Sequence, residues 1–124
     1  MLAPDPRHHD AGRRDEAFKL REEVLTLRRK VSGPEHPETL RAMNNLASSY
    51  ADAGRRDEAL KLREEELTLS RKVNGPEHPA TLLAMNNLAN SYRAKGEVAR
   101  AEALEKEIAA AKAKAKPAAQ PTAK

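Results

Sequence analysis

An internal copy of 42 residues constrains the fold of this chain more than any other feature. Residues 11–52 recur as residues 53–94, and the two copies differ at nine of 42 positions, so 33 are identical. A third copy begins at Gly96 and soon diverges. Self-similarity at a fixed period of this size is typical of stacked supersecondary units that pack on their neighbours. We therefore expect a short array of repeating units.

The composition fits a helical array and excludes several other classes. Charged residues make up 34% of the chain and aromatic residues 2%, so Leu and Ala contacts between neighbouring helices must supply the core. Cysteine is absent, which excludes disulfides, thiol nucleophiles and thiolate metal sites. The opening residues lack the pattern of a signal peptide, and no apolar run is long enough to span a bilayer. These features predict a cytoplasmic protein with no membrane contact.

The excess of positive charge is confined to the end of the chain. Four of the 23 lysines and arginines follow the last acidic residue, Glu107, and the remaining 19 match the 19 acidic residues. Residues 112–124 are rich in Ala, Lys and Pro, a composition that cannot bury enough apolar area to order itself. We predict that this tail is disordered. Because the rest of the chain is formally neutral, we disfavour nucleic acid as a partner; binding through the tail would be steeply salt-dependent.

Each copy carries the signals of two antiparallel helices. From about residue 37 to 53, Pro37 can occupy the first helical position, and apolar residues follow at steps of three and four. Gly54 then supplies a position that ends the helix. A second helix, from about 56 to 73, has an apolar stripe broken by one glutamate, with members Ala59, Leu62, Glu66, Leu69 and Val73. Gly75 and the prolines around it prevent continuation.

These residues resemble the tetratricopeptide repeat family. Small Ala47 and Ala59, together with Leu46, Tyr50 and Gly54, match its signature, in which small residues let two helices approach closely. The 42-residue period and the linker Gly33-Pro-Glu-His-Pro-Glu-Thr-Leu40 resemble the longer variant found in kinesin light chains and many bacterial repeat proteins. The resemblance covers roughly residues 11–110. It implies an all-α fold, a right-handed α-solenoid of antiparallel helix pairs with about five helices.

The resemblance divides the chain into a repeat domain with two flanking segments. Residues 1–10 are predicted to be disordered, residues 11–110 to form the repeats, and residues 112–124 to form the tail. The domain comprises a half repeat at 11–32, a repeat at 33–74 and a repeat at 75–113 that ends in a capping helix. The half repeat contains only a second helix, from about 14 to 31, whose apolar stripe has lost one partner (Ala17, Leu20, Val24, Leu27 and Val31). Either the chain is a fragment of a longer array, or another chain covers this stripe by self-association.

Glu66 departs from the apolar pattern of its stripe. The first copy has Val24 at this position and the third has Ile108. Nearby, Arg63 is expected to lay its methylenes over the neighbouring helix and keep its guanidinium in water, whereas the shorter carboxylate stem of Glu66 leaves the charge partly buried. Replacement of Glu66 by Val is expected to stabilise the fold by on the order of 1 kcal/mol.

A polar stripe on the first helix of each unit is the candidate binding surface. It lies nearly opposite the apolar face and comprises Arg41, Asn44, Asn45, Ser48 and Asp52, with Leu83, Asn86, Asn87, Asn90 and Arg93 in the next copy. In the resembled family the corresponding stripe lines a concave groove that holds extended peptides. By that family's register, four of the nine differences between the copies fall on five groove positions, where chance would place about one.

Two alternatives for this stripe remain open from the sequence. The differences either tune ligand binding or reflect drift at exposed positions. Asn45 and Asn87 either contact a ligand or satisfy backbone groups between stacked helices.

The sequence contains no pattern typical of a catalytic or metal site. His36 and His78 lie in Pro-flanked linkers one repeat apart, without the i, i+4 spacing of a helical metal site, so we expect a capping or solvent role. A Gly-rich phosphate loop and a nucleophile elbow are also absent. The sequence predicts a non-enzymatic module without cofactor or metal that binds a protein or peptide partner. A structural or oligomerisation module is the alternative.

Overall fold

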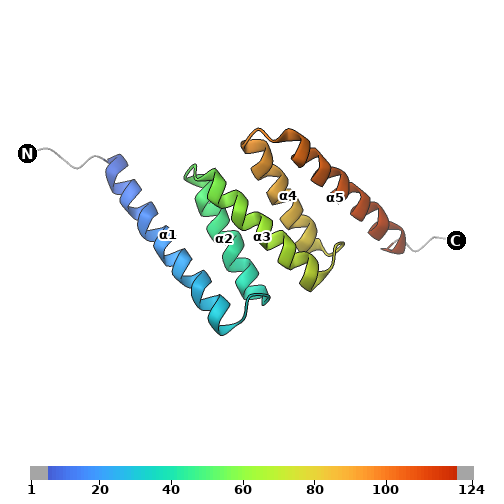
Figure 1. Cartoon of the computed structure of the whole chain (residues 1–124), viewed down its shortest axis with the longest axis horizontal. Coiled ribbons are helices and arrows are strands. Elements are labelled where there is room, and N and C mark those ends of the chain that lie inside the picture. The colour runs from blue at the N-terminus through green and yellow to red at the C-terminus, as the bar shows by residue number, and fades with distance from the viewer. Residues whose placement is uncertain (1–5, 120–124) are drawn as a thin grey trace, which may run out of the picture.

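Five helices stack in a row, each against its neighbours in the chain (Figure 1). The computed structural model describes the backbone of residues 6–119 and the side chains of residues 12–114. The helices are α1 (Pro6–Val31), α2 (Pro37–Asp52), α3 (Arg56–Asn74), α4 (Pro79–Ala94) and α5 (Val98–Ala119). The described residues form no strand. The expected all-α solenoid of five helices is confirmed.

The outer helices are longer than the sequence suggested. Helix α1 begins at Pro6 instead of near residue 14, and α5 continues to Ala119. The backbone is therefore helical at 6–10 and 112–119, where disorder was expected, while residues 1–5 and 120–124 lie outside the described residues. A proline is tolerated in the first turn of a helix, and Ala and Lys are strong helix formers. Local propensity thus favours the helical conformation of these segments.

In both repeats the linker has a glycine after one helix, and the same histidine contact begins the next helix. Gly75 has φ +96°, a conformation that L side chains rarely adopt. His78 precedes α4 and its Nδ1 accepts a hydrogen bond from the backbone N–H of Ala80 at 3.0 Å, as His36 does from Glu38 at 3.0 Å. Each histidine therefore satisfies one of the free N–H groups of a helix start. The capping role expected for both is confirmed.

Two hydrophobic clusters form the core, and α3 contributes to both. The first joins α1, α2 and α3, and its buried members are Phe18, Leu25, Ala42, Met43, Leu46, Ala47, Tyr50, Ala59 and Leu62. The second joins α3, α4 and α5, with buried members Leu60, Leu67, Ala84, Met85, Leu88, Ala89, Tyr92, Ala101 and Leu104. Ala47 and Ala89 have no exposed surface. Small side chains thus allow the close helix approach expected from the sequence.

Helix α1 exposes an apolar stripe that has no partner among the described residues. Leu20 is 62% exposed, Leu27 58% and Val31 77%. In α3 the equivalent Ala59 and Leu62 are buried in the first cluster. Because Phe18 and Leu25 are the residues of α1 that are buried in the first cluster, the other apolar face of α1 remains in solvent. The expected loss of one partner is confirmed.

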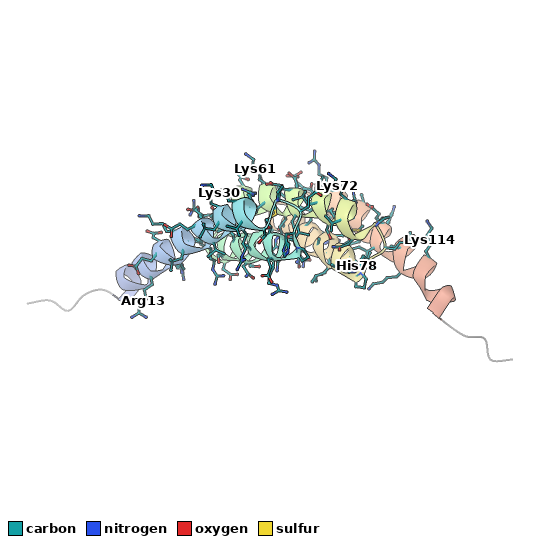
Figure 2. All side chains as sticks on the ribbon, turned by 90° about the horizontal axis from the view of Figure 1, so that it is seen from below. Arg13, Lys30, Lys61, Lys72, His78 and Lys114 are labelled. Carbon is teal, nitrogen blue, oxygen red and sulfur yellow. The ribbon has the colours of Figure 1, made fainter. Side chains whose placement is uncertain are left out.

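The helices follow an arc, which Figure 2 shows from the side. Lys61 and Lys72 of α3 lie on its outer side, and His78, which precedes α4, lies on the inner side (Figure 2). Helices α2 and α4 therefore form the inner layer, and α1, α3 and α5 form the outer one. None of the helices in the described part of the chain is long and apolar enough to cross a membrane.

Candidate peptide-binding groove

The inner side carries two hollows between α2 and α4. The larger has a volume of about 450 Å³ and is lined by residues of α2, α3 and α4 and of the linker before α4: Pro37, Leu40, Arg41, Asn44, Glu66, Ser70, Asn74, His78, Ala80 and Leu83. We call it the Glu66 hollow. The smaller, of about 170 Å³, is lined by Ala51, Arg56, Ala59, Arg63, Asn87, Asn90, Ser91 and Ala94. Helix α3 is the floor of both.

The predicted stripe residues divide between these hollows and the surface around them. Arg41, Asn44 and Leu83 line the Glu66 hollow, whereas Asn87 and Asn90 line the smaller one. Arg41, Leu83 and Asn90 are exposed, as ligand contacts must be. The stripe residues that line neither hollow and are exposed are Asn45, Asp52, Asn86 and Arg93.

A hydrogen-bonded network around Arg63 uses part of the predicted stripe. Arg63 is 7% exposed, and its guanidinium donates to Asn44 Oδ1 at 3.0 Å and to Ser48 Oγ at 2.9 Å. Asn87 Nδ2 also donates to Asn44 Oδ1, at 3.3 Å. Burial lowers the pKa of Arg63, and the charges of Glu66 and Asp52 oppose that effect.

This network corrects one expectation and gives Asn87 a partner that neither open alternative named. The guanidinium of Arg63 is buried, because the amide and hydroxyl of α2 replace its water contacts, so the expectation of a wet head group is wrong. Asn87 ties α4 to α2 through the side chain of Asn44, not through a backbone group. Asn44, Ser48 and Asn87 therefore have structural partners, while the exposed members of the stripe are better placed to meet a ligand.

Glu66 is the one described side chain with a fully buried polar atom that lacks a partner. Its Oε1 is inaccessible to solvent and accepts no hydrogen bond. Desolvation raises the pKa of Glu66 to about 7, and the positive charge of Arg63 opposes the rise. Burial of an unsatisfied carboxylate oxygen disfavours the ionised form and destabilises the fold.

Arg93, near the end of α4, forms an ion pair with α5. Its guanidinium donates to both carboxylate oxygens of Glu105 in α5, at 2.7 and 3.1 Å. This bidentate pair raises the pKa of Arg93 and lowers the pKa of Glu105. Arg41, in contrast, is paired only at 4.0 Å, with Glu38. Arg41 is therefore the more available cation of the predicted stripe.

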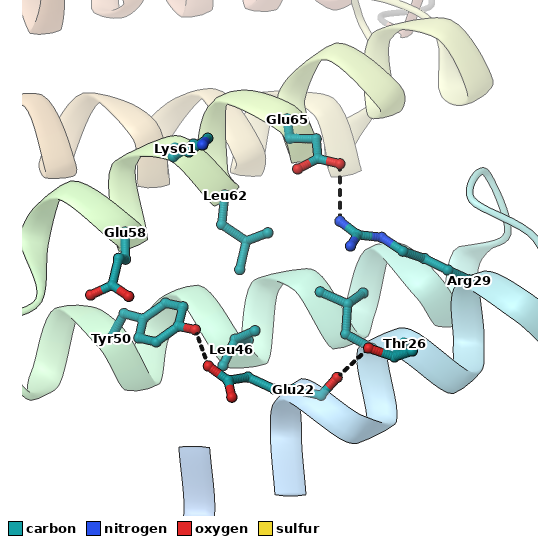
Figure 3. A pocket seen from close by; sticks show the side chains of 10 residues that line it. Glu22, Thr26, Arg29, Leu46, Tyr50, Glu58, Lys61, Leu62 and Glu65 are labelled. Carbon is teal, nitrogen blue, oxygen red and sulfur yellow. Dashed lines mark hydrogen bonds and ion pairs between the residues drawn. The ribbon is translucent and has the colours of Figure 1, made fainter. Parts of the chain in front are cut away.

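A hollow on the outer side lies where two consecutive repeats meet (Figure 3). It has a volume of about 310 Å³ and lies between α1 and α3 over α2. Across it, the Tyr50 hydroxyl donates to Glu22 at 2.5 Å, and Arg29 donates to Glu65 at 2.9 Å. Burial, with the Glu22 contact, raises the pKa of Tyr50 to about 12.

The same contacts recur one repeat later. Tyr92 donates to Glu64 at 2.7 Å, and Arg71 donates to Glu107 at 2.7 Å. Since each pair connects the same positions of consecutive units, these residues hold the repeats together.

Sequence reasoning missed the role of α3 in the groove. Glu66, Arg63 and Arg56 line the hollows although they belong to the second helix of the unit. The signal was present in the broken apolar pattern at Glu66, which sequence reasoning treated as a matter of stability alone. Among the described residues, no group of three or more His, Cys, Asp or Glu side chains could hold a metal ion.

The chain is similar to proteins of one repeat family. The tetratricopeptide repeat family model matches residues 8–62 and 42–114. Among solved structures, the nearly identical TPR-like repeats of a putative kinesin light chain from Podosopora anserina share 33% identity, with a TM-score of 0.75. The match covers 89% of this chain and 52% of that one. A point variant of the same protein gives 33% identity and a TM-score of 0.76, with the same coverage.

A third structure resembles the chain in fold alone. BtubC (BKLC) from P. vanneervenii is 22% identical, with a TM-score of 0.75, and the match covers 83% of this chain and 41% of that one. The chain thus spans about half the length of the solved structures that it matches. No curated protein matches it.

Proposed function

Because the chain belongs to the tetratricopeptide repeat family, whose repeats generally mediate protein–protein interaction, we propose that it binds an extended segment of another protein along the inner sides of α2 and α4. One observation carries the proposal. Several residues that differ between otherwise repeated copies, Arg41 and Leu83 among them, are exposed around hollows on the inner side. Packing residues such as Met43 and Met85 are unchanged and buried.

The proposed mechanism is recognition by side chains that are already ordered. The network of Arg63, Asn44 and Asn87 fixes the groove floor without a ligand, so little conformational entropy is lost on binding. The amides of Asn86 and Asn90 can donate to and accept from a peptide backbone. Two inner helices present a small area, so we expect modest affinity. The proposal includes a cytoplasmic location and no catalysis, cofactor or nucleic acid.

Peptide-display capture tests this proposal. The intact chain is compared with a groove variant that combines Arg41→Ala, Leu83→Ala, Asn86→Ala and Asn90→Ala, all at exposed positions. The control variant combines Lys19→Ala, Lys61→Ala and Lys106→Ala, which are exposed positions on the outer helices. Peptides with a shared motif should bind the intact chain and the control but not the groove variant. If nothing is enriched, or if both variants bind alike, the proposal fails.

The exposed stripe of α1 favours self-association as a second candidate function. Leu20, Val24, Leu27 and Val31 are between 47% and 77% exposed. In α3 the equivalent stripe packs on a helix, α2, of the same chain. The stripe of α1 therefore has the shape and spacing to accept one more helix.

The residues of this stripe and its flanks fit a helix from a second copy of the chain. In a heptad repeat, valine at core position a combined with leucine at core position d favours a pair of parallel helices. In that arrangement Glu16 lies near Arg21 of the second copy, and Glu23 lies near Arg28, so the flanking charges are complementary.

Sedimentation velocity over a range of concentrations tests the second candidate. Leu20→Asp should abolish the dimer, whereas Lys19→Asp, one residue off the stripe, should leave it intact. A chain that is monomeric at every concentration would rule self-association out.

A further inference from the structure

Glu66 is charged at a position where the other two copies of the repeat have an apolar residue. The first copy has Val24 there and the third has Ile108, and Ile108 packs against the second hydrophobic cluster. The buried oxygen of Glu66 has no partner, so the glutamate costs stability where an apolar residue would add it. Breaks of this kind, with no compensating contact in the fold, are typical of functional sites.

The carboxylate lies at the edge of a space large enough for a side chain. The Glu66 hollow has a volume of about 450 Å³ and opens on the proposed peptide groove. Leu40 of α2 and Leu83 of α4 are its apolar walls. Leu83 is 59% exposed, so a ligand can cover it.

Glu66 forms no ion pair with the charged side chains described around the hollow, although the positive charge of Arg63 favours its ionised form. Arg63, one turn earlier on α3, donates to Asn44 and Ser48. Arg41 of α2 lies at 4.0 Å from Glu38, and its side chain is 70% exposed. The Nδ1 of His78, before α4, accepts from Ala80.

The remaining polar groups of the hollow bond to one another. Asn74 Nδ2 donates to Ser70 Oγ at 3.1 Å, and the Ser70 hydroxyl lies 3.0 Å from that of Thr81. These side chains therefore have partners within the fold, in contrast to the buried oxygen of Glu66.

We propose that the Glu66 hollow binds a lysine or arginine side chain of the partner segment. The cationic head pairs with the Glu66 carboxylate, and the methylene stem packs between Leu40 and Leu83. An acidic or purely apolar side chain gains nothing from the carboxylate. The inference rests on the proposed function and gives it a specificity: one basic residue at a fixed place in the bound segment.

Binding of a cation is coupled to ionisation of Glu66. Burial raises the pKa of Glu66 to about 7, and a cation in contact favours the ionised form. Below pH 7 the protein must release a proton to bind, so a basic peptide should bind about tenfold more tightly at pH 8 than at pH 6. Replacement of Glu66 by Gln should remove this dependence.

Titration by NMR of the full chain, with labelled glutamate carboxyl carbons, tests the inference without a known partner. The probe is N-acetyl-lysine N-methylamide, and the control probe is the norleucine analogue, which has a similar stem and no charge. The lysine probe should lower the pKa of Glu66, and the norleucine probe should not. The variant Glu65→Gln, next to Glu66 but facing Arg29 on the outer side, should respond as the intact chain does. Equal titration of Glu66 with both probes overturns the inference.

Peptide display separates this inference from the proposed function. If the intact chain enriches peptides with Lys or Arg at one place, and Glu66→Gln captures peptides without that preference, both are supported. If enriched peptides lack a basic residue and bind Glu66→Gln equally well, the inference is overturned while the groove stands. If no peptide is enriched, the proposed function fails and the NMR titration alone decides the inference.

Discussion

At the scale of the residue, Glu66 makes stability depend on pH. The carboxyl has an ordinary pKa of 4.5 and a folded-state pKa of about 7. Between these values the folded chain binds more protons than the unfolded chain, so the free energy of unfolding decreases as pH rises. After allowance for partial exposure, the decrease is roughly 2 kcal/mol between pH 4.5 and 8.

Comparison of the intact chain with Glu66→Gln isolates this effect. Urea unfolding at several pH values should show the variant more stable at pH 8, with the difference shrinking toward pH 5. A difference that is constant from pH 5 to 8 would show that the carboxyl titrates normally in the fold.

Replacement of Glu66 by Val should stabilise the fold. The valine restores the residue of the first copy and removes a buried oxygen without a partner. We expect a gain on the order of 1 kcal/mol at pH 8, seen as a higher Tm in thermal unfolding. A lower Tm would mean that Glu66 has a stabilising contact in the folded chain.

Arg63 should contribute to stability through its network. Arg63→Met keeps the apolar stem but removes the donors to Asn44 and Ser48, and it removes the charge that favours ionised Glu66. We expect a loss of about 1–2 kcal/mol at pH 8 and a smaller loss at pH 5, where Glu66 is protonated. Urea unfolding at the two pH values measures both. An unchanged midpoint at pH 8 would mean that water replaces the network without cost.

At the scale of the helix, the histidine caps should be measurable. His78→Ala removes the acceptor for the N–H of Ala80 and should cost about 1 kcal/mol, with a similar cost for His36→Ala. His78→Asp should preserve the cap, because aspartate accepts the same bond. Urea unfolding of the three variants checks this. The cap assignment is wrong if His78→Ala is as stable as His78→Asp.

The positions of the helices were predictable because the residues that begin and end helices agree with the pattern of packed apolar residues. Pro37 and Pro79 begin helices, and Gly54 and Gly75, with φ of +81° and +96°, follow their ends. The outer ends of α1 and α5 were not predicted, since their composition favoured disorder in the sequence analysis. Helix propensity is a weak signal for such ends.

At the scale of the whole molecule, the stack was predictable and the groove only in part. The period and the buried Ala47, Ala59 and Ala89 determine how the units stack. Which stripe residues stay free depends on side chains that reach across from other helices, as Arg63 reaches Asn44. Such contacts join residues far apart in sequence, so helical periodicity alone cannot reveal them.

The inner sides of α2 and α4 form the binding surface in the function that we propose. The most direct test is an amide chemical-shift map of the isotope-labelled chain with the most enriched displayed peptide. We predict that shifts concentrate on α2 and α4 around Arg41, Leu83, Asn86 and Asn90, and on α3 at Glu66. Shifts confined to the α1 stripe of Leu20, Val24, Leu27 and Val31, or to the outer sides of α3 and α5, would contradict the proposal.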